Sequence, residues 1–186
     1  FTGPIETLTP AMAASAELAF KEASDSGSLL GGKYIKAMRG DSTCADSAAG
    51  TTAAQGLIDG GVVAIMGADC SGVTTAIADN AAIPNGVVMI SPSATSPALT
   101  SINDNGYFFR TAPSDARGGE ILAKITKDRK VKSVAITYTN SDYGKGLADV
   151  YESFVKSLGI KVTAVTAHED GKADYGADVA TLAAAG

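Results

Sequence analysis

The sequence has little positive charge and no long hydrophobic run, and each absence excludes a class of protein. Its 15 lysines and arginines are outnumbered by 20 aspartates and glutamates, for a net charge of −5. Without a basic stripe the chain does not fit a nucleic-acid-binding surface, so we expect no nucleic-acid partner. No apolar stretch approaches the ~20 residues that cross a bilayer. The 186 residues, 45% hydrophobic and 19% charged, are typical of a soluble globular chain with one large domain or two small ones.

Motifs for nucleotide binding and for nucleophilic catalysis are also missing. The chain contains no G-x-G-x-x-G, no G-x-x-x-x-G-K-[ST] and no G-x-S-x-G. His168 is the single histidine, and Glu169 and Asp170 follow it. A metal site needs more ligands than this region supplies. We interpret the cluster as a solvated strand end and expect neither a metal nor a cofactor.

The chain begins at Phe1 instead of methionine, and no basic region followed by an apolar core opens it. These features predict a processed or trimmed chain from which any signal peptide has been removed.

Cysteine is scarce: Cys44 and Cys70 are the two in the sequence. An even number fits one disulfide in an oxidising compartment, and two buried free thiols are the alternative. A bridge between them would contribute roughly 3–4 kcal/mol to stability on the chain-entropy model.

Helical and strand-like segments alternate along the chain in two series. Thr9-Pro10 is typical of a helix N-cap followed by proline at the first helical position. In the first series we predict helices over 9–24, 45–58 and 71–83, and strands over 33–39, 62–67, 86–90 and 107–111. In the second we predict helices over 115–128, 142–158 and 173–185, and strands over 133–139 and 160–167. This order predicts an α/β fold with parallel sheets and helices on both faces.

Both ends of this pattern look incomplete. No strand precedes the first predicted helix, and no strand follows the last. We therefore expect a fragment of something larger, with the segment TAPSD (111–115) as the crossing point between its two α/β units.

Three polar clusters follow predicted strands, at residues 67–72, 91–96 and 139–146. In open α/β sheets, ligands bind outside the carboxyl ends of the strands. The first and third clusters lead into helices, whose N-terminal amides favour an anion such as a carboxylate. The hydroxyls of Ser71, Ser93 and Thr95 would add neutral hydrogen bonds to a small zwitterion. The alternative is that Ser, Thr and Pro only terminate strands and cap helices.

Taken together and in order, six stretches resemble the periplasmic binding proteins for leucine, isoleucine and valine. These are FTGP (1–4), GDSTCADS (40–47), GADCSG (67–72), VMISPSATSPALT (88–100), FFRTAPSD (108–115) and NSDYGKGLA (140–148). The resemblance extends to the wider type I solute-binding proteins of ABC importers. It implies a type I periplasmic-binding-protein fold, with two doubly wound parallel-sheet lobes that close on a ligand around a hinge. The first lobe would cover 1–112, with its first strand missing, and 113–186 would begin the second, so that the chain is an N-terminal fragment.

The same resemblance implies roles for individual residues. Ser71 would bind the ligand carboxylate through its hydroxyl and amide, and Ser93 would offer its backbone carbonyl to the ammonium. Thr95 would contact both ends of the ligand through side chain and backbone, Tyr143 would reach it from the second lobe, and Ala94 would also belong to the site. The two cysteines fall where these proteins carry a disulfide, which favours a Cys44–Cys70 bridge.

One position departs from the family. Leu8 would line the side-chain pocket where the leucine-binding proteins carry an aromatic residue, which leaves the ligand's identity open. The family's acidic partner for the ammonium would lie beyond Gly186.

The function this implies is non-enzymatic. The protein would capture an amino acid or a related carboxylate or amide outside the cytoplasm and deliver it to a membrane permease. It would be a monomer, periplasmic, or lipid-anchored if the organism is Gram-positive. One alternative is a ligand-sensing domain of a receptor or regulator. Another is a hydrolase that uses Ser71 or Ser93, although no general base is evident for it.

Overall fold

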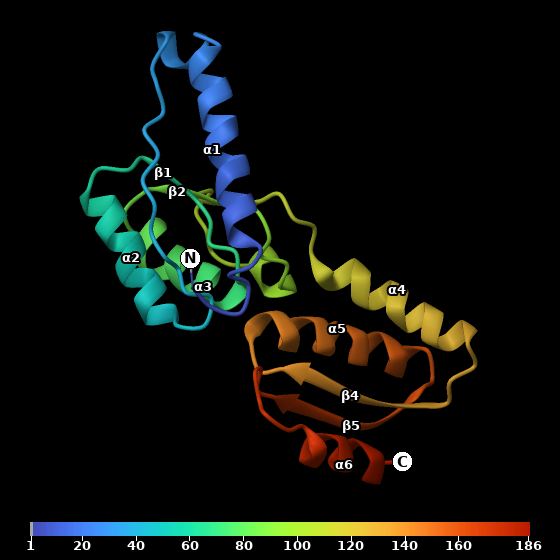
Figure 1. The fold of residues 1–186 in the computed structure, drawn as a ribbon. Coiled ribbons are helices and arrows are strands. Elements are labelled where there is room, and N and C mark those ends of the chain that lie inside the picture. Colours follow the sequence, from blue (N-terminus) through green and yellow to red (C-terminus); the bar gives the residue numbers. More distant parts are fainter. Residues whose placement is uncertain (1) are drawn as a thin grey trace. The chain divides into compact units, whose positions relative to one another are not determined.

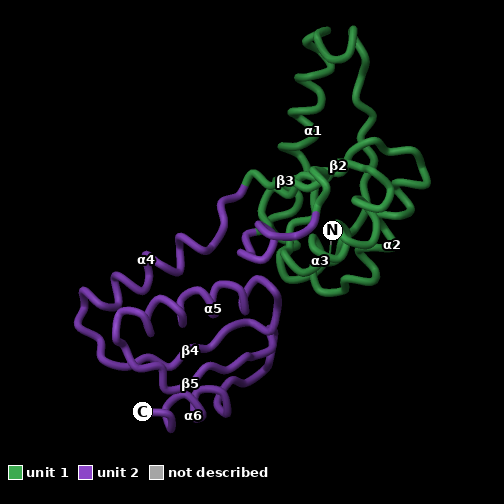
Figure 2. Tube along the Cα trace, turned by 180° about the vertical axis from the view of Figure 1, so that it is seen from behind, with its two compact units in different colours: residues 1–94, 104–111 green, residues 95–103, 112–186 purple. Residues whose placement is uncertain are grey.

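The computed structural model describes residues 2–186 and divides them into two compact units. Unit 1 holds the chain up to Ala94 together with Asp104–Thr111, and unit 2 holds Thr95–Asn103 and Ala112–Gly186 (Figure 2). The chain therefore passes between the units after residues 94, 103 and 111. The predicted lobe boundary at residues 112 and 113 remains a prediction.

Unit 1 is built around a three-stranded parallel sheet (Figure 1). Its strands run in the order β1 (Ala64–Met66), β2 (Val88–Ser91) and β3 (Phe108–Arg110), and Met89 pairs with Ile65 on one side and Phe108 on the other. The helical elements are α1 (Thr9–Asp25), η1 (Leu29–Gly31), α2 (Ser47–Asp59), α3 (Ser71–Ile77) and the π-turn η2 (Ala78–Ala82) that continues α3. The predicted alternation of helices and short parallel strands is confirmed for these elements.

The core of unit 1 is formed by buried side chains of the sheet, of α2 and α3, and of the π-turn η2. Met89 and Val73 are its largest fully buried side chains. Gly50 allows α2 to approach α3, because a Cβ there would lie 2.5 Å from Cγ1 of Val73. Asp46 caps α2 by accepting hydrogen bonds from the amides of Ala48 and Ala49.

Two local predictions in unit 1 are wrong. Leu8, and not Thr9, occupies the N-cap position of α1, and the Thr9 hydroxyl instead donates to the carbonyl of Glu6. Residues 33–39 form no strand. Their alternating pattern requires a neighbouring strand for its backbone, and none of residues 2–186 supplies one. The segment is held to α1 by a hydrogen bond from the Ile35 amide to Ser24 Oγ and by the Arg39–Glu17 ion pair.

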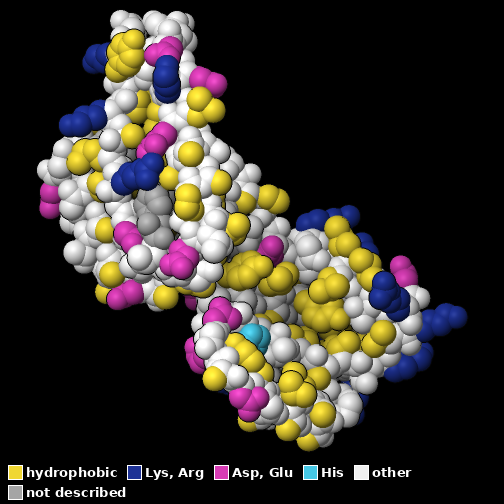
Figure 3. All heavy atoms as spheres, in the orientation of Figure 1, with side chains coloured by type: hydrophobic (Ala, Val, Ile, Leu, Met, Phe, Trp, Pro, Cys, Tyr) yellow, Lys and Arg dark blue, Asp and Glu magenta, His cyan; other side chains and the backbone are white. Residues whose placement is uncertain are grey.

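Large apolar side chains of this unpaired segment, and Val63 just before β1, remain on the surface. Tyr34 and Val63 are 75% and 87% exposed, and Met38 is 45% exposed. Figure 3 shows apolar side chains in yellow among the charged ones on the visible face. The alternating pattern of residues 33–39 therefore favours a strand, but these residues have no partner strand among residues 2–186.

Unit 2 contains a two-stranded parallel sheet, β4 (Ser133–Thr139) beside β5 (Lys161–His168). Its helical elements are η3 (Pro97–Thr100), α4 (Asp115–Asp128), α5 (Asp142–Ser157) and α6 (Gly176–Ala184). Figures 1 and 2 show α5 and α6 on opposite sides of the strand pair. The predicted second series is confirmed. Ser114 and Ser141 cap α4 and α5 through side-chain hydrogen bonds to backbone amides.

The core of unit 2 centres on Ala123, Val155 and Ile160. Partly buried apolar side chains from α5 and both strands pack around them. Gly119 lets α4 lie against α5, since a Cβ there would lie 2.6 Å from Cγ1 of Val150. Within residues 2–186, no helix combines the length and the hydropathy needed to cross a bilayer.

Gly144, in the first turn of α5, has no room for a side chain. A Cβ there would lie 2.2 Å from the carbonyl oxygen of Thr139, whereas outside its own helix nothing lies within 4 Å of the same position at Gly118 in α4. We expect Gly144→Ala to cost about 1–3 kcal/mol through overpacking. The matched Gly118→Ala should stabilise by about 0.5–1 kcal/mol through helix propensity. Urea unfolding of both variants measures the difference, and equal effects would contradict the close approach.

Candidate functional site

The carboxyl ends of β1 and β2 are joined by hydroxyl groups within unit 1. The Ser91 hydroxyl donates to the Ala68 carbonyl at 2.5 Å, and the Thr74 hydroxyl donates to the same carbonyl at 3.0 Å. The Ser93 hydroxyl donates to the Asp69 carbonyl at 2.9 Å. Two of the three polar clusters predicted from the sequence, residues 67–72 and 91–96, therefore meet at one edge of the sheet.

These bonds also give the hydroxyls of Ser91 and Ser93 a structural role. Both are engaged by backbone carbonyls 23 and 24 residues away. These bonds are compatible with the alternative from the sequence, that such residues terminate strands, and a ligand contact by the Ser93 residue remains a prediction. The carbonyl of Ser93 is a different case, because no hydrogen bond within residues 2–186 uses it. It is the group to which the family resemblance assigns a ligand contact.

Ser71 begins α3 and is 2% exposed. It follows Cys70 directly, and Cys70 is joined to Cys44 by a disulfide with a Cα–Cα distance of 5.2 Å. The predicted bridge is confirmed, and the alternative of two free thiols is wrong. The bridge ties the loop after β1 to the loop before α2, so the residues on either side of Ser71 are fixed by a covalent link and by α3 itself.

The remaining predicted site residues are distributed over both units. Ala94 is fully buried, its amide donates to Ser91 Oγ and its carbonyl accepts from Arg110. Thr95 belongs to unit 2, where its carbonyl accepts the Asp115 amide at 3.0 Å. Tyr143, in the first turn of α5, is 49% exposed, and Leu8, at the start of α1, is 59% exposed. Their joint contact with a ligand remains a prediction.

Asp69 belongs to the same strand-end cluster, and the sequence did not single it out. Its side chain is half-buried, and Oδ1 accepts a long hydrogen bond of 3.3 Å from Ser93 Oγ. Burial raises the pKa of Asp69, and the Ser93 hydrogen bond opposes this only in part. The signal that could have found it is an acid placed between the end of a predicted apolar strand and a cysteine.

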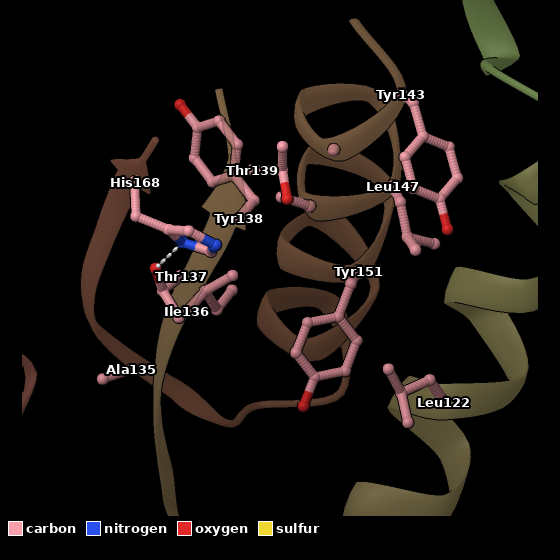
Figure 4. Close-up of a pocket in the computed structure, with 12 residues that line it drawn as sticks. Leu122, Ala135, Ile136, Thr137, Tyr138, Thr139, Tyr143, Leu147, Tyr151 and His168 are labelled. Carbon is pink, nitrogen blue, oxygen red and sulfur yellow. Dashed lines mark hydrogen bonds between the residues drawn. The ribbon is translucent and has the colours of Figure 1, made fainter. Parts of the chain in front are cut away.

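A hollow of about 460 Å³ lies in unit 2, beside β4 (Figure 4). Five consecutive residues, 135–139, line it, together with Leu122, Tyr143, Leu147 and Tyr151. Because consecutive strand residues point to opposite faces, a hollow that touches all five runs along the edge of the strand. Among the described strands, β4 pairs only with β5, so its other edge is unpaired. The hollow lies along this unpaired edge.

His168 also lines this hollow, at the end of β5. Its Nδ1 lies 2.7 Å from the Thr137 hydroxyl, and its ring meets that of Tyr175 edge-on at 5.8 Å. Asn140 and Thr139 bind the carboxylates of Glu169 and Asp170. Among residues 2–186 no group of three or more His, Cys, Asp or Glu could hold a metal ion.

Comparison with known proteins identifies the family. The sequence profile described as "Receptor family ligand binding region" matches residues 11–183, so the chain belongs to this family of ligand-binding domains. The predicted resemblance to leucine/isoleucine/valine-binding proteins is confirmed at the level of individual relatives. The chain is 30% identical over its whole length to Leu/Ile/Val-binding protein homolog 3 of Brucella melitensis, covering 50% of that protein. It is also 30% identical over its whole length to the leucine-, isoleucine-, valine-, threonine- and alanine-binding protein of Pseudomonas aeruginosa, covering 49% of it.

Solved structures give the fold. The branched-chain amino acid transporter substrate binding protein LivJ from Streptococcus pneumoniae, in complex with isoleucine, matches with a TM-score of 0.80 and 28% identity. The match covers 98% of this chain and 51% of that one. The protein has the type I periplasmic-binding-protein fold, and the chain spans about half the length of the relatives it matches. An ABC transporter substrate-binding protein from Desulfitobacterium hafniense, in complex with Leu, also matches, with a TM-score of 0.71 and 28% identity over 98% of this chain and 52% of that one.

Proposed function

We propose that this protein is the extracytoplasmic solute-binding component of an ABC importer. It captures a small amino acid, or a related carboxylate or amide, and delivers it to a membrane permease. It acts as a monomer without chemical turnover. The Cys44–Cys70 disulfide supports the extracytoplasmic location, because such bridges persist in oxidising compartments.

The observation that carries the proposal is the strand-end cluster of unit 1. Here Ser71 and the Ser93 carbonyl lie at the carboxyl ends of parallel strands, where ligands bind in α/β sheets. Ser71 hydrogen-bonds the ligand carboxylate and Ser93 the ammonium, with Ala94, Thr95, Tyr143 and Leu8 completing the contacts. The chain crosses between the two units after residues 94, 103 and 111, and these three crossing segments are the candidate hinge. Ligand contacts that favour a closed arrangement would drive its closure.

A ligand-sensing domain would use the same cluster and differ only in what is attached to it. The sequence of the complete gene decides between the two, through a permease operon context or a linked signalling domain. A serine hydrolase has less support, because the single histidine lies in unit 2 at the end of β5.

Thermal-shift and calorimetric titration of the full-length gene product test the proposal. The standard amino acids, simple amides and small aromatic acids form the panel. A ligand at 100 times its Kd should add about 2.7 kcal/mol of stability. No binding by any member of the panel would overturn the importer assignment, and conversion of a bound ligand would favour an enzyme.

Ser71→Ala should weaken binding of the ligand by about 10- to 100-fold. The reason is that one hydrogen bond to a charged group, worth about 1.5–3 kcal/mol, is lost from a site that excludes water. The matched control is Thr52→Ala on α2, whose exposed hydroxyl bonds only the Ala48 carbonyl of its own helix. Titration calorimetry at constant pH measures both. Equal affinity of the Ser71 variant and the control would remove Ser71 from the site.

A further inference from the structure

Asp69 is an acidic side chain placed inside the strand-end cluster without a positive partner. It lies three residues after the end of β1, one residue before the bridged Cys70 and two before Ser71. The seven ion pairs found within residues 2–186 lie elsewhere, and none involves Asp69. The half-buried carboxylate therefore has one polar side-chain neighbour, the neutral Ser93 hydroxyl.

A purely structural role does not account for this carboxylate. An acid before a helix usually accepts backbone amides from the first turn. Here the residue at the N-cap of α3 is Cys70, and no side chain caps that helix. The single hydrogen bond to Asp69 Oδ1 is 3.3 Å long, while the same hydroxyl bonds the Asp69 carbonyl at 2.9 Å. Ser93 is therefore held without help from the carboxylate.

Burying an uncompensated carboxylate is unfavourable, and a cation that reaches it would recover the lost interaction. The adjacent groups, Ser71 and the Ser93 carbonyl, are those assigned to the ligand above. We propose that Asp69 is a specificity-determining residue that receives a positively charged group of the ligand. This inference rests on the proposed function. The inference limits the expected ligands to solutes with an ammonium or another cationic group that contacts Asp69 in unit 1.

Asp69→Asn in the full-length protein is the test, because asparagine keeps the shape and the acceptor for Ser93 and removes only the charge. Asp79→Asn is the matched control. Asp79 is exposed on the π-turn that continues α3, so the control makes the same change in net charge away from the cluster.

Three ligands separate the sources of the positive charge. Leucine carries only its α-ammonium, 4-methylpentanoate is the same molecule without it, and lysine adds a second ammonium on its side chain. If Asp69 meets the α-ammonium, Asp69→Asn weakens leucine binding by about tenfold or more and leaves 4-methylpentanoate unaffected. If Asp69 meets a side-chain cation, the wild type prefers lysine to leucine and the variant loses that preference.

Either selective loss supports the inference. It is overturned if Asp69→Asn behaves like Asp79→Asn, or if it changes the affinity for charged and uncharged ligands equally. Absence of binding by the wild type to every amine and acid would instead overturn the proposed function itself. The two failures are therefore distinguishable in one set of titrations.

Thermal unfolding without ligand adds an independent readout. Because burial raises the pKa of Asp69 above its unfolded value, the free energy of unfolding falls as the pH rises from the unfolded pKa to the folded pKa, and it stays reduced above that range. Asp69→Asn should therefore raise Tm at neutral pH while it weakens binding. A lower Tm would show that the carboxylate stabilises the fold, which a residue kept for a ligand cation does not do.

Discussion

Replacing Cys44 and Cys70 together by alanine should lower the free energy of unfolding by about 3–4 kcal/mol. The bridge closes a loop of 26 residues, and the expected loss is the loop-closure entropy regained by the unfolded chain. Thr43 and Cys44 both have positive φ, +59° and +68°. This conformation is unfavourable for residues other than glycine, and the bridge holds the chain in it.

Denaturant unfolding of the full-length protein measures this loss, with the reduced wild type as a control for the chemistry of the substitutions. Either single variant should match the double variant, because one missing sulfur removes the whole link. A loss below about 1 kcal/mol would mean that the loop before α2 is held by its other contacts. Those contacts include the Asp41 carboxylate, which accepts the amide of Thr43 and the amide and hydroxyl of Thr2.

Met89→Ala should cost about 2–5 kcal/mol, because it removes the largest fully buried side chain among residues 2–186. Met89 lies on the middle strand of the sheet and pairs with Ile65 of β1 and Phe108 of β3. A cavity at this position cannot be filled by movement of a surface loop, so most of the penalty should remain.

Met89→Leu tests whether the loss of stability in Met89→Ala comes from lost side-chain volume or from the loss of the methionine thioether. A volume-conserving exchange of this kind usually costs less than about 1.5 kcal/mol. Chemical unfolding of both variants gives the comparison, and Met38→Ala provides a control at a side chain that is 45% exposed. If Met89→Ala and Met38→Ala were equally mild, the sheet of unit 1 would not form the core described here.

Local features of unit 2 were predictable from the sequence for a physical reason. The predicted limits of α4 and β4 coincide with the structure, at residues 115–128 and 133–139. Ser114 and Ser141 stand next to the helices that they cap, and the apolar period of α5 is visible within one segment. The family likeness and the disulfide followed from ordered motifs over the whole chain. Helix formation depends on residues three or four apart, which a sequence displays directly.

Tertiary structure alone decided the rest. Residues 33–39 alternate as a strand does and form none, since a strand exists only through pairing with another segment. Asp69 became a candidate only when folding placed it beside Ser93, 24 residues away, and partly removed it from water. Pairing, burial and the loss of solvation are all set by residues distant in the chain, so no local pattern in the sequence displays them.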